Sequence, residues 1–207
     1  MKFLEDGEVL VVSGVVVDTI TTTAQPFYLD GPESEVTPTL IAFHNWFTVF
    51  VNNFGSDNLD VFARTFCGGA WHPRYSEFEK DLSQRLTFFF RLIQKLLPAL
   101  LRDGNPVKHL MEDRVLPREV LEAREHAMVS AAALQMHAKR FVLTRTRLAG
   151  LAPQETKEGD KIVVLLGCDF PVVLRSIGDY WKLIGEVYVD GIMYEERVDP
   201  ERSFAIR

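Results

Sequence analysis

The chain has 207 residues, a formal net charge of -6 and 47% hydrophobic residues. That length supports one buried core, and that hydrophobic content excludes a globally disordered chain. The acidic balance excludes general nucleic-acid binding. The two cysteines exclude a disulfide framework. The sequence lacks an apolar run of the ~20 residues that a bilayer span needs, which excludes a membrane-spanning protein.

The first predicted element is a strand over residues 8–20, where β-branched valines dominate the sequence. Gly14 lies in its middle, and a glycine inside a strand often marks a bulge or a bend. The segment 21–38 holds three prolines among small and acidic residues, which predicts a loop.

A helical insertion is predicted over residues 39–138. Within it, apolar residues recur at three- and four-residue steps over 40–54, and a short helix is expected over 58–66. A long amphipathic helix is expected to begin at Ser76, and another helix over 117–139. These helices are expected to place their phenylalanine and leucine faces in a core.

The period changes from helical to strand-like in a β-rich region over residues 139–196. Strands are predicted over 141–144, 161–166, 172–175 and 180–189, with a turn-rich stretch over 148–153. The tail 197–207 is predicted to be polar and extended.

An isolated apolar strand is unstable, because its backbone N–H and C=O groups need partners. The strand 8–20 is therefore expected to join the C-terminal strands in one small antiparallel β-sheet or barrel, with the helical insertion packed against it. The predicted fold is a single α+β unit over residues 1–207.

Few side chains of this sequence suggest a reaction centre. The five histidines lack metal-site spacing, and no nucleotide-binding glycine motif occurs, so neither a metal nor a cofactor is expected. A hydrolase or transferase that uses Cys67, with His72 beside it, remains an alternative. The strand-end carboxylates offer a second version of that alternative; they are Asp160, Asp169, Asp179 and Asp190.

Aromatic side chains cluster near the end of the β-rich region. Alternation along the strand puts Trp181 and Leu183 on one face and Tyr180 and Lys182 on the other. Since tyrosine and tryptophan are common in interfaces, a protein-contact surface is predicted. Its residues are Trp181, Tyr188 and Tyr194. A small-ligand or oligonucleotide-binding barrel is a further alternative.

The order of motifs over residues 139–196 resembles the C-terminal region of fungal heterokaryon-incompatibility (HET domain) proteins. A Gly-Asp pair at 159–160, an apolar run, a Pro-x-x-x-Arg segment at 171–175 and a Gly-Glu-x-Tyr-Val-x-Gly-Ile-Met segment at 185–193 follow one another as in that family. The structural residues of this pattern are Gly159, Asp160, Gly167, Pro171, Arg175, Gly185 and Gly191.

The Trp-x-Asp and Cys-Ile-Asn-Gln segments of the HET domain itself are absent from this sequence. The resemblance implies a role in nonself recognition and regulated cell death. It also implies a non-enzymatic, cytoplasmic regulatory or recognition module that contacts a protein partner, with a HET effector domain as the candidate.

Overall fold

The structure is a computed structural model that describes residues 2–3, 9–28, 36–55, 58–66, 68, 133–193 and 202–206. Two compact units divide the chain. The first combines Met1–Thr23 with Arg140–Arg207, and the second is Ala24–Lys139. The expectation of a single α+β unit over the whole chain stays a prediction.

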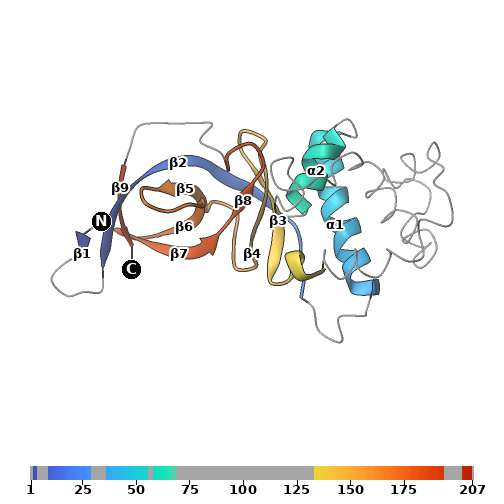
Figure 1. Ribbon diagram of the computed structural model, residues 1–207, viewed down its shortest axis with the longest axis horizontal. Helices are drawn as coiled ribbons and strands as arrows, with labels where there is room; N and C mark the ends of the chain where they lie inside the picture. The colour runs from blue at the N-terminus through green and yellow to red at the C-terminus, as the bar shows by residue number, and fades with distance from the viewer. Residues whose placement is uncertain are drawn as a thin grey trace. The chain divides into compact units, whose positions relative to one another are not determined.

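A strand-rich sheet forms the first unit (Figure 1). Nearly all of its pairings are antiparallel, and the short contact of β7 with β9 is parallel. Its order is β5-β6-β7-β9-β2-β3-β4-β8, with β1 against β2 and a further pairing of β5 with β2. The strands are β1 Lys2–Phe3, β2 Leu10–Thr23, β3 Lys139–Thr144, β4 Ala149–Pro153, β5 Lys161–Leu165, β6 Val172–Ile177, β7 Tyr180–Glu186, β8 Tyr188–Val189 and β9 Arg202–Ile206.

The long strand β2 holds this sheet together. Its first residues pair with β9, its middle with β5 and its last residues with β3. The prediction that the opening strand pairs with the C-terminal strands is confirmed. The register shifts between Val16 and Asp18 and between Ile20 and Thr22, rather than at Gly14. These bulges let one strand bend and change partners.

Gly14 serves a different purpose from the expected bend. It pairs with β5 on one side and with β9 on the other. A Cβ atom at this position would lie 2.6 Å from the backbone oxygen of Val164. The glycine is therefore required by the close approach of two backbones.

Alternation along the strands builds two apolar clusters on opposite faces. In β6, Val172 and Leu174 belong to one cluster and Val173 to the other, and Ile162 and Val163 of β5 divide in the same way. The cluster that contains Val163, Val172 and Leu174 is enclosed by β2, β5, β6, β7 and β9, whose pairings close on themselves in a ring. The second cluster adds residues from β3, β4 and β8.

Two predictions for the C-terminal region need correction, and a third, the extended tail, becomes more specific. The stretch 148–153, predicted as turn-rich, contains β4, whose residues pair with β8. The single predicted strand 180–189 is divided at Val187 into β7 and β8. The extended tail contains β9, which pairs with β2 through five residues. In each case long-range pairing decides the backbone conformation.

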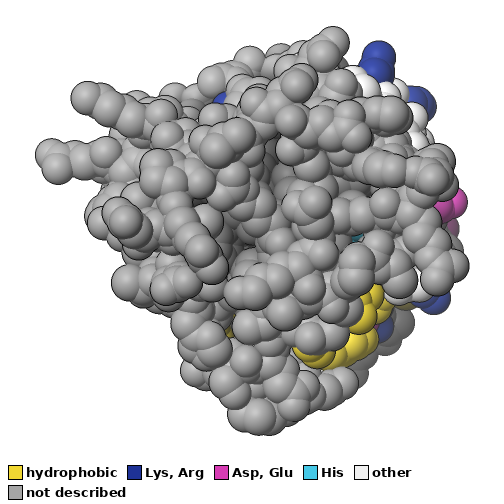
Figure 2. All heavy atoms as spheres, turned by 90° about the vertical axis from the view of Figure 1, so that its right-hand side faces the viewer, with side chains coloured by type: hydrophobic (Ala, Val, Ile, Leu, Met, Phe, Trp, Pro, Cys, Tyr) yellow, Lys and Arg dark blue, Asp and Glu magenta, His cyan; other side chains and the backbone are white. Residues whose placement is uncertain are grey.

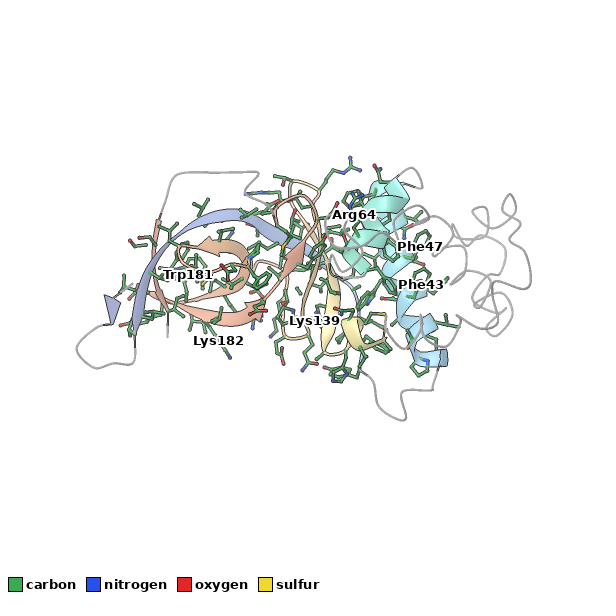
Figure 3. The ribbon with its side chains drawn as sticks, in the orientation of Figure 1. Phe43, Phe47, Arg64, Lys139, Trp181 and Lys182 are labelled. Carbon is green, nitrogen blue, oxygen red and sulfur yellow. The ribbon has the colours of Figure 1, made fainter. Side chains whose placement is uncertain are left out.

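The second unit contains the helices α1 Val36–Phe54 and α2 Leu59–Phe66. Both agree with predicted helices, and α1 begins earlier than expected. Their aromatic side chains form a buried cluster, to which Phe43 and Phe47 of α1 belong (Figure 3). Phe62 of α2 contacts both rings edge-on. Trp46 donates from Nε1 to the backbone oxygen of Gln25 at 2.8 Å.

Other predicted helices lie outside the described residues. This holds for the helix expected from Ser76 and for most of the helix over 117–139, of which residues 133–136 are described and are helical. The loop predicted over 21–38 is described over residues 21–28 and 36–38; its first three residues belong to β2 and its last three to α1.

Candidate functional site

The Gly-Asp pair of the sequence pattern forms a charged centre in the first unit. Asp160 is buried just before β5 and accepts two hydrogen bonds from Arg175 of β6, each of 2.8 Å, from Nε and Nη2. The Asp160 carboxylate also accepts from the backbone N–H of Lys157 at 2.8 Å. Arg175 Nη2 donates in addition to the backbone oxygen of Glu155 at 2.7 Å.

Side-chain and backbone hydrogen bonds together hold the backbone of this centre. The hydrogen bonding that Arg175 donates to the Asp160 carboxylate raises the pKa of Arg175, so the guanidinium stays charged. On the backbone side, Ile20 of β2 donates to the Asp160 carbonyl, and Gly159 donates to the Ile20 carbonyl, each at 2.9 Å. The pair therefore fastens the turn between β4 and β5 to β6 and β2.

A second buried carboxylate, Asp18 of β2, was not among the predicted site residues. Its Oδ1 accepts from the Thr19 N–H at 2.7 Å. Its Oδ2 accepts from the Thr146 N–H at 2.8 Å and from the Thr146 hydroxyl by a short bond. Burial alone would raise the pKa of Asp18, but these bonds and one from Thr144 outweigh it and hold the pKa below its usual value.

The Asp18 contacts predict a loss of stability in acid. Because the folded-state pKa is lowered, the stabilisation is fully present above the unfolded-state pKa of about 3.9 and disappears as the pH falls through the folded-state pKa. We expect Asp18→Asn to lower the free energy of unfolding by about 2 kcal/mol at pH 7. Urea denaturation at pH 7 and near pH 3 measures this difference, which should shrink in acid.

The exposed Asp179 provides a matched control, because Asp179→Asn removes a carboxylate from a hairpin turn at the surface. That variant should unfold like the unaltered chain at both pH values. A difference for Asp18→Asn that is equal at pH 7 and near pH 3 would contradict the assigned pKa direction.

The other residues of the sequence pattern lie at turns and close approaches. Gly167 and Gly191 have positive φ angles in turns, and the Pro171 carbonyl accepts from the Val187 N–H at 3.0 Å. Gly185 has φ near +149°, and a Cβ atom there would lie 2.9 Å from Pro153 Cγ. These glycines and this proline thus reflect backbone geometry, and among the structural residues of the pattern only Asp160 and Arg175 carry charge.

The predicted aromatic surface is divided by the structure. Trp181 packs edge-on against Phe204 of β9, with ring centroids 5.5 Å apart, and contacts the cluster inside the ring of strands. The neighbouring Lys182 is exposed (Figure 3). The Tyr188 hydroxyl donates to Asp190 Oδ1 at 3.3 Å, and Tyr194 lies outside the described residues.

Among the described residues, several large apolar side chains outside the predicted aromatic set are exposed. In the first unit they are Leu166, Phe170, Ile177 and Leu183, on the β5–β6 turn and the β6–β7 hairpin. In the second unit they are Tyr28, Ile41 and Leu134. Figure 2 shows hydrophobic side chains among the described residues of one face of the molecule.

The residues of the alternative enzyme hypothesis do not converge where they are described. Cys67 and His72 lie outside the described residues, and Cys168 is an exposed thiol. Asp169 and Asp179 are exposed in turns, whereas Asp160 is paired with Arg175. In the described part of the chain, no three His, Cys, Asp or Glu side chains group as metal ligands would. None of the described helices combines the length and hydropathy that crossing a bilayer requires.

Sequence reasoning found the Asp160 and Arg175 positions but missed what surrounds them. A signal for Asp18 was present, because an aspartate inside a β-branched strand has to find polar partners when the strand is buried. Its partners lie 128 residues away at Thr146, and no local pattern indicates that pairing.

Comparison with known proteins agrees with this geometry. Residues 110–204 match the family model of the Het-6 beta-barrel domain. The chain is 43% identical over 68 residues to heterokaryon incompatibility protein 6, OR allele, of Neurospora crassa, which covers 31% of this chain and 10% of that protein. The matched part is thus a small fraction of that protein's length. No solved structure matches the chain. The predicted resemblance to the C-terminal region of heterokaryon-incompatibility proteins is confirmed, and the family model that residues 110–204 match is that of the Het-6 beta-barrel domain and not of a HET domain.

Proposed function

We propose that this chain is a non-enzymatic regulatory or recognition module of a HET-type protein. It acts in the cytoplasm by contact with a protein partner, for which a HET effector domain is the candidate. The process is fungal nonself recognition and the cell death that follows it.

This proposal rests on the contacts that the structural residues of the family-like pattern make. Asp160 and Arg175 are the charged members among these structural residues, and their hydrogen bonds go to each other and to backbone atoms of the β4–β5 turn. A carboxylate held by a guanidinium and a backbone N–H is poorly placed to exchange protons with a substrate. Charged groups that hold backbone in this way favour a structural scaffold whose surface binds a partner.

The β6–β7 hairpin is the part of the first unit that best fits a contact surface. Ile177 is 54% exposed and Leu183 is 48% exposed, and Lys182 beside Leu183 in β7 is also exposed. Trp181 lies on the same strand but is held by Phe204, so it supports the hairpin from within. Rigid strands with a few exposed apolar residues and a lysine are typical of a polar-rimmed interface.

A binding experiment tests this proposal. The purified chain should retain HET-domain proteins in a pull-down at micromolar concentration, and Leu183→Glu should weaken retention at least tenfold, since a charge would be buried in the contact. Leu166→Glu is a matched control, because Leu166 is also 48% exposed but lies on the β5–β6 turn. Absence of retention, or equal loss with both variants, would argue against the proposal.

A further inference from the structure

Two guanidinium groups from different strands are bound to successive carbonyls of the turn between β4 and β5. Arg140 of β3 donates from Nη1 to the Thr156 carbonyl at 2.9 Å. Arg175 of β6 donates from Nη2 to the Glu155 carbonyl at 2.7 Å. Since consecutive residues are only about 3.8 Å apart along the backbone, the two cations meet at the same turn.

A third cation, Lys182, lies opposite Arg175 on the neighbouring strand. β6 and β7 are antiparallel, and Arg175 and Lys182 are directly paired in their register. Side chains of directly paired residues point to the same side of a sheet. The adjacent Trp181 contacts the cluster inside the ring of strands, and Lys182 points away from that ring (Figure 3). Lys182 therefore lies on the same side of the hairpin as Arg175.

One exposed carboxylate, that of Glu155, lies near these cations. Its Oε1 accepts from Gln154 Nε2 at 2.8 Å. That hydrogen bond and one from its own backbone N–H lower the pKa of Glu155, and the positive charges of Arg140 and Lys182 lower it further. The carboxylate is thus ionised at neutral pH. The three cations, Arg140, Arg175 and Lys182, form a basic rim around it.

The basic rim carries more positive charge than the carboxylates of the β4–β5 turn neutralise. Asp160 is buried and neutralises Arg175 through two hydrogen bonds. Lys157 and Glu158, which are adjacent on the turn, offset each other. Glu155 alone then opposes the other two cations of the rim, so one positive charge remains. On a chain whose net charge is -6, this is a place that attracts an acidic partner.

The distribution of charge favours a short acidic segment of a protein. Guanidinium and ammonium groups bind carboxylates and phosphates alike. A nucleic acid presents a long row of phosphates, which the net charge of -6 on the whole chain repels. A peptide brings a few carboxylates together with apolar side chains. Ile177 is 54% exposed and lies on the same side of β6 as Arg175, two residues away, so it offers an apolar contact next to the rim.

We propose that the basic rim binds an acidic segment of a protein partner, and that one carboxylate of this segment takes the place of Glu155 beside Arg140 and Lys182. Glu155 competes for the same two cations, so its side chain turns aside when the segment binds. This inference rests on the proposed function, because it assumes a protein partner, and it adds the chemistry by which that partner is recognised.

Fluorescence anisotropy of a fluorescein-labelled hexaglutamate peptide, titrated with the whole purified chain, tests the rim. We expect binding that weakens as the salt is raised from about 50 mM to about 200 mM, because exposed charges are screened. Lys182→Gln should weaken binding about threefold, the effect of one exposed charge pair, whereas Lys182→Arg should preserve it. Glu155→Gln should strengthen binding about threefold, because the internal competitor is removed.

Arg145→Gln is the matched control, because it removes one positive charge from a side chain that is 73% exposed on the β3–β4 turn, outside the rim. It should leave the affinity unchanged. Equal losses with Arg145→Gln and Lys182→Gln would reveal general attraction and overturn the proposal. No gain with Glu155→Gln, or no binding of the peptide, would also overturn it. Tighter binding of an oligothymidylate at the same salt would do so in favour of nucleic acid.

The pull-down with HET-domain proteins separates this inference from the proposed function. If the peptide responds to the variants as expected while no HET-domain protein is retained, the proposed function fails and the basic rim stands. If HET-domain proteins are retained equally by the unaltered chain, Lys182→Gln and Glu155→Gln, the rim is not the contact. The inference then fails while the proposed function stands.

Discussion

Replacing Asp160 with asparagine is expected to lower the free energy of unfolding by about 3 kcal/mol, measured by urea denaturation at pH 7. The substitution preserves size but leaves Arg175, whose side chain is 25% exposed, without its buried counter-charge. An amide also turns one donor toward the donors of Arg175 or Lys157, where the carboxylate accepts from both. Partial exposure of Arg175 keeps the loss below that of a fully buried pair.

The control for this experiment is Asp169→Asn, which removes a carboxylate from the exposed β5–β6 turn and should change stability by less than about 0.5 kcal/mol. Arg175→Lys should fall between the two, because lysine cannot reproduce the two-pronged contact with Asp160. An Asp160→Asn variant as stable as the control would show that the pair does not fasten the turn.

Replacing Gly14 with alanine is expected to cost about 3 kcal/mol of unfolding free energy, among the larger effects of overpacking. The added Cβ would meet the Val164 backbone oxygen at 2.6 Å and the Leu165 Cα atom at 3.2 Å. Since these are backbone atoms between paired strands, they cannot rotate away. Relief requires β2 and β5 to separate, which weakens the ladder between them.

The neighbouring residue Ser13 gives a matched control in the same strand. Ser13→Ala shortens a half-buried side chain and should change stability by less than about 0.5 kcal/mol. Thermal or urea unfolding of both variants measures the difference. Equal stability of Gly14→Ala and Ser13→Ala would mean that the strands tolerate a side chain at this crossing.

The pairing of β2 with the C-terminal strands was predictable from one physical requirement. In the sequence, no other strand is predicted near this run of valines before residue 139, and strands reappear after it. Hydrogen-bond satisfaction then leaves few arrangements. The turns at Gly159, Gly167 and Gly178 were predictable from their sequence context. In the structure all three glycines have positive φ angles.

The elements that sequence reasoning misplaced depend on distant partners. The segment of β4 contains a glycine and a proline and has no alternating pattern, yet Gly150 and Leu151 pair with β8. The prediction that Trp181 belongs to a contact surface stays a prediction, but alternation along the strand did not indicate which residue packs against its ring. It is Phe204, 23 positions further along the chain, that packs against it.

By itself, the sequence determined the strand-rich class, the family-like order of motifs and the charged residues Asp160 and Arg175. These follow from local periodicity, turn chemistry and composition, which act over a few residues. Only the tertiary structure decided that Asp160 grips Arg175 and the backbone of the β4–β5 turn, and that Asp18 meets Thr146 across 128 positions. Such contacts depend on strand register and on bulges in β2, and a register is fixed by the packing of both faces of the sheet at once.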